Sequence, residues 1–461
     1  MSPESLAASV SGPLKPLTEP GAELTAAEVR RYSRHLMLPD VGVIGQRRLK
    51  NAAVLVIGAG GLGSPVLLYL AAAGVGTIGI LDDDVVDESN LQRQVIHGTS
   101  DLGRAKVDSA AEAIGRLNPL VQVVRHRLRL DRSNALQILG EYQLVLDGTD
   151  NFATRYLVGD ACAVLRLPLV WGSIFRFDGQ VAVFWSDPIP IEDGETGPDG
   201  EGGQGLTAPE PVTYRDLHPV PPPAGSVPSC AEGGVLGVLC AAIGSVMATE
   251  AVKLICGIGE PLLGRLMIFD ALGMTWRTIR VRPAPEAKPI TALLDDYDAF
   301  CAAGPGPSAG SGPGTGDAIT VLELAEWLAR RERGEEDFVL VDVREPWERE
   351  IAVIPGAVGI PLDRLRNGAA GPVLASVAGR SRIVLHCQSG GRSAQALLLA
   401  QEAGFADAVH VAGGVLAWIE QVDQVDQVDQ VDPGRPTSPA VDPPAGAEAT
   451  LGPDAVSGAA T

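Results

Sequence analysis

The chain has 461 residues, of which 46% are apolar, and this is enough material for two globular domains. Its formal net charge of −21 opposes general affinity for nucleic acid or for an anionic membrane surface. No apolar run reaches the roughly 20 residues of a membrane-spanning helix. The six cysteines form no CxxC pair, which argues against a disulfide framework and favours a reducing compartment. We therefore expect a soluble cytoplasmic protein that binds neither nucleic acid nor membrane.

Composition divides the chain into five segments. Residues 1–22 are rich in Pro, Gly, Ala and Ser, and we expect them to be disordered. Residues 23–290 have the pattern of a large α/β domain, and residues 291–316 form a linker that contains "GPGPSAGSGPGTG". Residues 317–421 form a smaller α/β domain. Residues 422–461 contain the repeat "QVDQVDQVDQVD" and then Pro- and Ala-rich sequence, so we expect a disordered tail.

The large domain begins with a helical pattern, "TAAEVRRYSRHLMLP", that stops at Pro39. "AAVLVIGAGGLGSPVLLYLAAAGVGTIGILDDD" then predicts strand, glycine-rich turn, helix and strand, and its continuously apolar strands indicate a buried parallel sheet. Further strands are predicted in "YQLVLDGTDN" and "PLVWGSIFRFDGQVAVFW", and a buried helix in "GGVLGVLCAAIGSVMATEAVKLICG". Residues 187–227 have almost no periodic pattern, which is typical of a functional or disordered loop. The pattern predicts a Rossmann-like α/β fold.

The turn "GAGGLG" follows the first strand and spells GxGxxG through Gly58, Gly60 and Gly63. Small residues at a helix N-terminus let backbone N–H groups approach phosphates, and Asp82, about 20 residues further on, can bind ribose hydroxyls. The motif therefore predicts a nucleotide site. By itself it fits an NAD-dependent oxidoreductase as well as an ATP-dependent enzyme.

Charged residues after these glycines separate the two interpretations. A hydride-transfer site needs a nicotinamide pocket and usually a general acid. Attack on the α-phosphate of ATP instead needs cations around the phosphates and a carboxylate for Mg²⁺. Arg93 in "SNLQRQ", Lys106 in "GRAK" and Asp150 in "DGTDN" form that second set, although each alone also fits a surface charge or a turn. Together they favour ATP and Mg²⁺.

A series of motifs resembles the MoeB/ThiF group, the bacterial relatives of ubiquitin-activating enzymes. The motifs are "RYSRHLMLP", "GAGGLGS", "LDDDVVDESNLQRQ", "GRAK", "LNP", "DGTDN" and "PSCAEGGVLG", in this order over about residues 24–285. The resemblance implies a homodimer that adenylates the C-terminal Gly-Gly carboxylate of a small ubiquitin-like sulfur carrier of the MoaD/ThiS kind. The chemistry fits, because such an attack needs positioning and cationic stabilisation rather than a protein nucleophile.

The same resemblance implies a role for each matching residue. Gly60 lies at the phosphates, Asp82 holds the ribose, Lys106 binds phosphate, and Asp150 positions Mg²⁺ as its metal ligand. The remaining ATP contacts fall on Ser89, Asn90, Leu91, Gln92, Arg93 and Asn151, with Asn90 and Arg93 at the triphosphate. Arg34, in "RYSR", matches the family's arginine that reaches the ATP of the neighbouring subunit. Arg93 and Asp150 are the implied catalytic residues among these.

Two positions differ from the family pattern or leave its chemistry open. Many relatives hold a structural Zn²⁺ with two CxxC pairs, but Thr213 and Asp216 stand at the first pair and "RPAPEAKP" contains no cysteine for the second. A tetrahedral zinc site cannot be assembled from these residues, so we expect no zinc. Cys230, in "PSCAEGG", stands where thioester-forming members place a cysteine. It fits a catalytic thioester or persulfide relay, and equally an inert cysteine near a helix start.

The smaller domain contains a second glycine-rich loop, "HCQSGGRS", between a predicted strand and a helix that begins near Ser393. Such a turn points backbone N–H groups at the sulfur of Cys387, and the helix dipole and Arg392 add positive potential. These features stabilise an anionic thiolate or persulfide. We do not expect Cys387 to be a buried core cysteine, because Gly390, Gly391 and Arg392 do not pack apolar cores.

The loop spacing indicates sulfur rather than phosphate chemistry. Cysteine phosphatases space the pair as C-x5-R, whereas Cys387 and Arg392 are C-x4-R, a smaller ring that suits sulfur. The stretch resembles the rhodanese family, supported by "VDVREPWE", "IPGAVGIP" and "AGGVLAWIE" over about residues 317–421. One departure is Ala352-Val353, where that family usually has Gly-His.

An adenylating domain fused to a rhodanese domain resembles MoeZ-type adenylyltransferase/sulfurtransferases. The resemblance implies that one domain activates a carboxylate and that the other delivers sulfur to it from a Cys387 persulfide, giving a thiocarboxylate. Thiosulfate or a cysteine desulfurase is the expected sulfur donor. The alternative is a ubiquitin-type activating enzyme that passes a modifier to target proteins through a Cys230 thioester.

Overall fold

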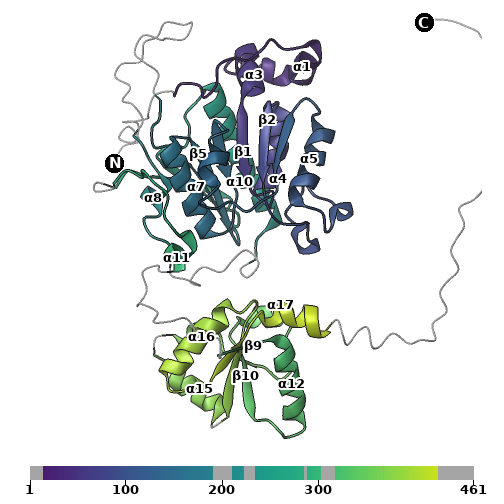
Figure 1. The fold of residues 1–461 in the computed structure, drawn as a ribbon, viewed down its shortest axis with the longest axis vertical. Coiled ribbons are helices and arrows are strands. Elements are labelled where there is room, and N and C mark those ends of the chain that lie inside the picture. The colour runs from purple at the N-terminus through teal and green to yellow at the C-terminus, as the bar shows by residue number, and fades with distance from the viewer. Residues whose placement is uncertain are drawn as a thin grey trace, which may run out of the picture. The chain divides into compact units, whose positions relative to one another are not determined.

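The structure is a computed structural model, and it describes residues 14–189, 210–222, 234–284, 288–302, 317–366, 368–379 and 381–423 (Figure 1). The chain separates into two compact units, Met1–Gly312 and Pro313–Thr461.

The first unit is built on an eight-stranded mixed sheet with the order β3-β2-β1-β4-β5-β6-β7-β8. The five strands from β3 to β5 are parallel, and β6, β7 and β8 continue the sheet in antiparallel fashion. The strands are β1 (Ala53–Ile57), β2 (Thr77–Leu81), β3 (Gln122–His126), β4 (Leu144–Asp147), β5 (Leu169–Phe175), β6 (Asp178–Phe184), β7 (Arg265–Asp270) and β8 (Thr275–Arg280).

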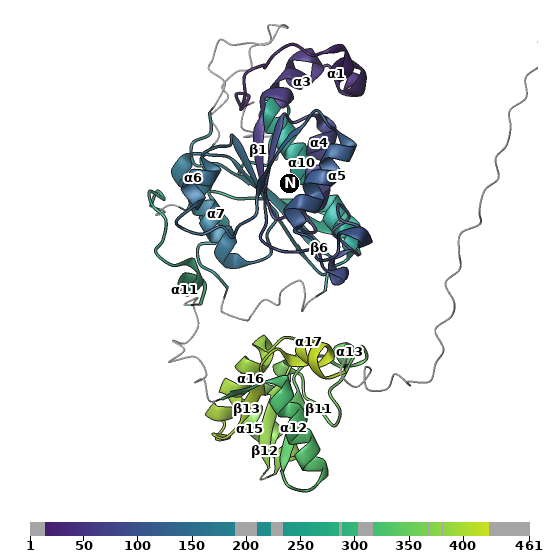
Figure 2. The ribbon, with the colours of Figure 1, turned by 45° about the vertical axis from the view of Figure 1, so that its right-hand side comes forward.

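Helices cover both faces of this sheet. The α-helices are α1 (Ala26–Arg31), α2 (Ser33–Leu36), α3 (Gly42–Asn51), α4 (Gly63–Ala73), α5 (Lys106–Leu117), α6 (Ala135–Leu139), α7 (Phe152–Leu165), α8 (Tyr214–Leu217), α10 (Gly237–Cys256) and α11 (Tyr297–Ala302), with short 3-10 turns η2 (Glu88–Asn90) and η3 (Thr99–Asp101). Figure 2 shows α4, α5 and α10 on one side of the sheet and α6 and α7 on the other. The central strand β1, "AVLVI", is apolar throughout, as a strand covered on both faces requires.

The second unit is a five-stranded, fully parallel sheet with the order β11-β10-β12-β13-β9. Its strands are β9 (Ala318–Ile319), β10 (Phe338–Asp342), β11 (Val358–Gly359), β12 (Arg382–His386) and β13 (Val409–Val411). Its helices are α12 (Val321–Glu332), α13 (Pro346–Arg349), α14 (Leu362–Leu365), α15 (Ala370–Ala378), α16 (Gly391–Glu402) and α17 (Gly414–Trp418), followed by a π-helical turn, η4 (Ile419–Asp423). Two apolar clusters form its core, one under α15 and α16 and one under α12 and α17. The predicted fold class is confirmed for both units.

Two segment boundaries in the structure differ from those that composition indicates, one for the expected disordered N-terminus and one for the expected linker. Residues 14–22 pack on the first unit: Leu14 is buried, and the N–H of Leu17 donates to the C=O of Leu254 at 3.1 Å. The expected linker also begins too early, because α11 packs against α7 and the buried Tyr297 hydroxyl donates to Asp160 at 2.8 Å. Composition misses both segments because their few apolar and aromatic residues find partners only in the folded domain.

Helix α10 corrects the expectation about membrane spans. By length and composition alone it could cross a membrane. In the structure it packs against α4 and strands β5 and β6, and its side chains Ile243, Met247 and Leu254 are buried in the core. Its apolar character is therefore that of a helix buried inside a large domain.

Several predicted features lie outside the described residues. They are Cys230 and most of the "PSCAEGG" motif, much of the patternless 187–227 stretch, the glycine-rich part of the linker, and the tail from residue 424.

Candidate functional site

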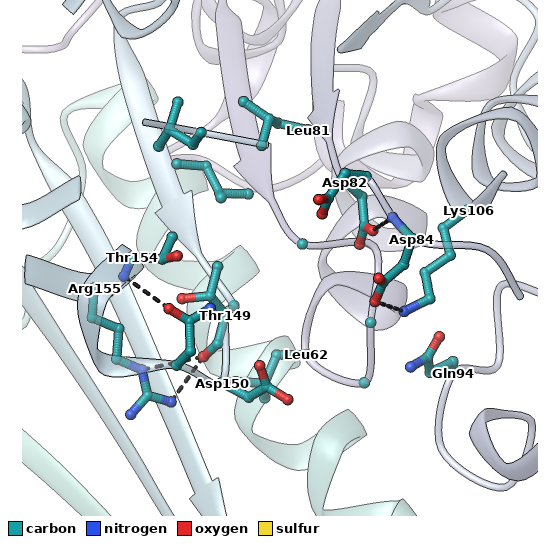
Figure 3. Close-up of a pocket in the computed structure, with 18 of the residues that line it drawn as sticks. Leu62, Leu81, Asp82, Asp84, Gln94, Lys106, Thr149, Asp150, Thr154 and Arg155 are labelled. Carbon is teal, nitrogen blue, oxygen red and sulfur yellow. Dashed lines mark hydrogen bonds and ion pairs between the residues drawn. The ribbon is translucent and has the colours of Figure 1, made fainter. Parts of the chain in front are cut away.

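A cavity of about 450 Å³ lies in the first unit where β1, β2 and β4 end (Figure 3). Parallel strands place their carboxyl ends at one edge of the sheet, and ligands of open α/β sheets bind outside that edge. The polar and glycine residues that line the cavity are Gly58, Gly60, Gly61, Asp82, Asp83, Asp84, Arg93, Gln94, Lys106, Arg129, Gly148, Thr149, Asp150, Asn151, Thr154 and Arg155.

The three motif glycines differ in backbone conformation and in the space around them. Gly58 has a φ of +90°, which side chains rarely adopt. A β-carbon on Gly63 would lie 1.9 Å from the carbonyl oxygen of Gly58, so the close approach of α4 to β1 excludes any side chain there. A β-carbon on Gly60 would meet nothing closer than 3.7 Å, namely Gln94 Nε2. The protein itself therefore leaves space at Gly60, on the cavity wall, where a ligand can approach the backbone.

One wall of the cavity carries a carboxylate cluster and a lysine. Asp82 accepts the N–H of Ala59 at 2.8 Å and that of Asp84 at 2.9 Å, which fixes it beside the glycine turn. Burial raises the pKa of the Asp82 carboxyl, and the nearby Lys106 ammonium offsets this only in part. Lys106, itself nearly buried, donates to Asp84 Oδ2 at 2.9 Å. This wall presents both an acceptor for hydroxyl groups and a cation.

The opposite wall is the loop after β4. The buried Asp147 accepts from both the N–H and the hydroxyl of Thr149, at 2.9 and 2.7 Å. Arg155 reaches back from α7 and donates to the Thr149 carbonyl through Nε and Nη2. This bracing leaves the Asp150 side chain exposed on the cavity wall, as Figure 3 shows. Asn151 caps α7 by accepting the Thr154 N–H at 2.8 Å.

The structure brings together six of the residues predicted for the nucleotide site. Gly60, Asp82, Arg93, Lys106, Asp150 and Asn151 all line the cavity. Ser89, Asn90, Leu91 and Gln92 lie in and after η2 and are not among the residues that line the cavity. The Ser89 carbonyl accepts from Arg93, and Asn90 accepts from Gln94, and both of these partners do line it. Arg34 is exposed on α2 and is not part of this wall.

The second glycine loop encloses a sulfur atom. Cys387 follows β12, its Sγ accepts the Gly390 N–H at 3.1 Å, and α16 begins at Gly391. The expectation that Cys387 would not be a core cysteine is wrong, because its side chain is fully buried and belongs to an apolar cluster of the second unit. The glycines explain this: Gly390 turns the chain with a φ of +106°, and Gly414 packs against the Cys387 carbonyl with no room for a β-carbon.

The cation of this loop is held by a carboxylate. Arg392 donates to both oxygens of Glu348, at 2.7 and 2.6 Å. Burial opposes ionisation of Glu348, but the hydrogen bonds from Arg392 and the Glu345 N–H hold the pKa of its carboxyl below the usual value. The Arg344 side chain, which is buried, is held by Asp342 at 2.7 Å and donates to Gln388 Oε1 at 2.9 Å.

Sequence reasoning missed several of these residues. Asp84, Thr149 and Gln94 stand inside the motifs quoted above, but the sequence indicates roles only for their neighbours Asp82, Asp150 and Arg93. Arg155 lies just after "DGTDN", and Glu348 is the last residue of "VDVREPWE". The position of these residues inside or beside a motif is the sequence signal that could have identified them. The pairing of Glu348 with Arg392 has no such signal, because the two residues are 44 positions apart and meet only in the folded sheet.

Thr213 and Asp216, which stand where the first CxxC pair of the family pattern would fall, hydrogen-bond to each other. Asp216 accepts from the N–H and the hydroxyl of Thr213, at 2.7 and 2.8 Å, and from the N–H of Ala284 at 3.0 Å. Asp216 therefore joins the start of α8 to the segment after β8.

Comparison with known proteins agrees with this division into two sites. Residues 32–290 match the ThiF family and residues 324–421 match the rhodanese-like domain. The chain is 54% identical over 413 residues to "Probable adenylyltransferase/sulfurtransferase MoeZ" of Mycobacterium tuberculosis, which covers 90% of this chain and 98% of that protein.

Two further relatives match different shares of this chain. The sulfur carrier protein adenylyltransferase of Thermus thermophilus is 50% identical over 282 residues, which cover 60% of this chain and 98% of that protein. The adenylyltransferase and sulfurtransferase MOCS3-2 of Zea mays is 37% identical over 415 residues, covering 87% of this chain and 81% of that protein. The chain therefore belongs to the ThiF family, and with its rhodanese-like domain it is an adenylyltransferase and sulfurtransferase of the MoeZ type.

Proposed function

We propose that this enzyme adenylates the C-terminal Gly-Gly carboxylate of a ubiquitin-like sulfur-carrier protein and then converts it to a thiocarboxylate. The observation that carries the proposal is the presence, in one chain, of a cavity at the sheet edge with a glycine turn and a second glycine loop that holds a cysteine. The names of the relatives from Mycobacterium tuberculosis and Thermus thermophilus support it, because they combine adenylyl transfer, sulfur transfer and a sulfur carrier.

In the first step the carrier carboxylate attacks the α-phosphorus of ATP and pyrophosphate leaves, so that a mixed anhydride with AMP forms. Gly60 and the N-terminus of α4 offer backbone N–H groups to the phosphates, and Lys106 and Arg93 neutralise charge that builds during transfer. Asp82 accepts from the ribose hydroxyls. The exposed carboxylate of Asp150 is an oxygen ligand of the kind that Mg²⁺ prefers, so we assign it to the metal. The metal would neutralise phosphate charge.

In the second step a persulfide on Cys387 attacks the acyl carbon and AMP leaves, which links the carrier to the enzyme as an acyl disulfide. A second thiol then attacks Cys387 sulfur, which releases the thiocarboxylate and leaves a disulfide. Cys230 is our candidate for that thiol, and an external thiol is the alternative. The assay is Cys230→Ala with and without dithiothreitol: a rate equal to the unmutated enzyme without reductant would contradict a role for Cys230.

Arg34 suggests that the enzyme works as a homodimer. It does not line the cavity of its own chain, and Met37 and Leu38, just after it, are exposed by 77% and 51%. We propose that this apolar surface pairs with a second copy and that Arg34 reaches that copy's ATP. Mixing Arg34→Ala with Asp150→Ala chains should then restore adenylation, because one active site of the mixed dimer has both residues. Failure to complement in a mixed dimer would contradict this arrangement.

The experiment that tests the adenylation step is ATP–pyrophosphate exchange with a purified sulfur carrier. Exchange should require the carrier's C-terminal carboxylate and Mg²⁺, and NAD should not bind. Exchange without a carrier, or binding of NAD in place of ATP, would contradict the proposal. We also propose a cytoplasmic location, which suits a cysteine that must be kept reduced between turnovers.

A further inference from the structure

The loop that holds Cys387 contains a single cation, and the structure neutralises it. Between Cys387 and Arg392 the loop residues are Gln, Ser, Gly and Gly. Both oxygens of Glu348 accept from Arg392, and the two side chains are only 5% and 17% exposed. Bidentate arginine–carboxylate pairs of this kind are strong and fixed in direction, and they interact more strongly when partly buried.

The other guanidinium groups nearby do not replace that cation. Arg344 is fully buried against Asp342, and its remaining donors go to Gln388 Oε1 and to the carbonyls of Glu348 and Ala352. Arg349 turns toward β11, where it donates to the Ala357 carbonyl at 3.0 Å. His386, the residue before Cys387, is buried, and burial lowers its pKa to about 4, so that it is neutral near pH 7.

Apolar side chains are exposed at the end of the unit that carries the loop. Segments that follow β10, β12 and β13 lie at the carboxyl edge of the parallel sheet, and the cysteine loop is the one that follows β12. Figure 2 shows α13 and α17 together at this end of the unit. The N–H of Leu416 donates to the Gln388 carbonyl. Exposed apolar side chains of this end are Trp347 (48%), Ile351 (79%), Val353 (48%) and Leu416 (38%). The exposed residues between and beside them include Ser389 of the loop and the carboxylate Glu350, so that among these exposed residues a small anion with two charges meets no added cation.

We propose that Glu348 is a specificity-determining residue, which makes Cys387 take its sulfur from a thiol persulfide rather than from thiosulfate. This rests on the proposed function, in which Cys387 becomes a persulfide. With thiosulfate, the Cys387 thiolate attacks the outer sulfur, the S–S bond breaks, and sulfite leaves as a dianion. With a persulfide R–S–S⁻, the thiolate attacks the terminal sulfur and the thiolate R–S⁻ leaves. Both steps conserve charge and give the same Cys387 persulfide.

The difference between the donors is the charge that the loop must stabilise. Thiosulfate and the departing sulfite each carry two negative charges, whereas a persulfide and its thiolate carry one. Arg392 is the loop cation that could pair with a dianion, and Glu348 competes for it with two short hydrogen bonds. Specificity of this kind arises from disfavouring the wrong substrate as much as from attracting the right one.

The test compares kcat/KM for thiosulfate and for cysteine persulfide, with persulfide on Cys387 followed by intact mass. Glu348→Gln keeps an acceptor for the Glu345 N–H, which Glu348 holds at 2.9 Å in α13, but removes the charge. We expect the ratio of the two kcat/KM values, thiosulfate over persulfide, to rise by about tenfold, mainly through a lower KM for thiosulfate. Glu348→Ala should move the ratio in the same direction. Circular dichroism establishes that each variant is folded.

A matched control and a donor comparison complete the experiment. Glu335→Gln removes a carboxylate that pairs with Arg333 before β10, at the opposite edge of the sheet, and it should leave the ratio unchanged. Ile351→Ser should slow sulfur transfer from a cysteine desulfurase charged with L-cysteine and spare transfer from free cysteine persulfide, if the persulfide is carried by a protein. If Ile351→Ser left the rates of sulfur transfer from both donors unchanged relative to the unmutated enzyme, a small persulfide would be identified as the source.

Different results would contradict the role of Glu348 and the proposed function on which it rests. An unchanged or lower ratio in folded Glu348→Gln would overturn the role of Glu348, because Arg392 would then need its partner to act. A failure of the underlying proposed function looks different, since no donor would place a persulfide on Cys387 even in the unmutated enzyme.

Discussion

The two glycine loops of this chain have the same local plan and opposite outcomes. Each follows a buried parallel strand and leads into a helix, β1 to α4 in the first unit and β12 to α16 in the second. At Gly60 the protein leaves room for a β-carbon and the loop borders a cavity, whereas at Gly414 the backbone of the second unit packs directly on Cys387. A strand–glycine–helix arrangement therefore does not by itself define a phosphate site. The side chains and packing around the loop decide whether it receives a ligand or encloses its own reactive atom.

The largest expected effect is a double separation of the two activities. Cys387→Ala should abolish sulfur transfer and leave carrier-dependent ATP–pyrophosphate exchange near normal, because the thiol is the only group in that loop that can carry sulfur. Asp150→Ala should abolish exchange and leave the Cys387 persulfide able to form. Both assays on both variants measure this. If either single change removed both activities, the two loops would not be independent sites.

A matched pair of glycine substitutions compares a position where a ligand is expected to approach the backbone with a position where the protein's own backbone fills the space. Gly60→Ala should fold with an unchanged Tm but raise the KM for ATP by about tenfold, since the new methyl group occupies the approach of the phosphates. Gly63→Ala should lower the Tm or prevent folding, because its β-carbon would lie 1.9 Å from the Gly58 carbonyl oxygen. Thermal melts and ATP titrations separate the two cases. The reverse pattern, a stable Gly63→Ala and an unstable Gly60→Ala, would show that the assignment of open space is wrong.

A smaller effect is expected where a carboxylate stands at the family's zinc position. Asp216→Ala removes three hydrogen bonds and should cost the first unit about 1–3 kcal/mol. Asp187→Ala is the control: its ion pair with Arg166 is exposed on both sides and should contribute little. Purified protein should also contain far less than one zinc per chain. Stoichiometric zinc, or loss of stability on chelation, would contradict the role given to Asp216.

Another prediction concerns acid stability, and here the two units should behave alike. Burial lowers the pKa of His218 in the first unit and of His386 in the second to about 4. Each imidazole is neutral when folded but binds a proton below about pH 6.5 when unfolded, so stability is lost as the pH falls from 6.5 toward 4. His386→Gln and His218→Gln should each reduce the decrease in stability between pH 6.5 and 4 for the unit that contains the substitution. Calorimetry between pH 4 and 7 measures this pH dependence. An unchanged slope of stability against pH in either variant would show that its histidine does not cause the loss.

The sequence predicts both folds because their central parallel strands, such as β1, β4 and β10, are largely apolar and the turns after β1 and β12 contain glycine. It also identifies the side chains that share a motif with the cavity, such as Asp82 and Lys106. Two kinds of feature remain hidden. Partners far apart in the chain, such as Glu348 and Arg392, meet only through the order of the strands. Burial of Cys387 depends on how closely Gly414 approaches, and the packing of residues 14–22 and 291–302 depends on a few contacts that composition does not reveal.

The central claim is that one chain activates a carboxylate and supplies its sulfur. The most direct measurement is the intact mass of a purified sulfur carrier after incubation with this enzyme, Mg²⁺, ATP and a sulfur donor. The account predicts that one oxygen of the carrier's C-terminal carboxylate is replaced by sulfur, only when ATP is present and only when Cys387 is intact. An unmodified carrier, or sulfur transfer that proceeds without ATP or with Cys387→Ala, would contradict it.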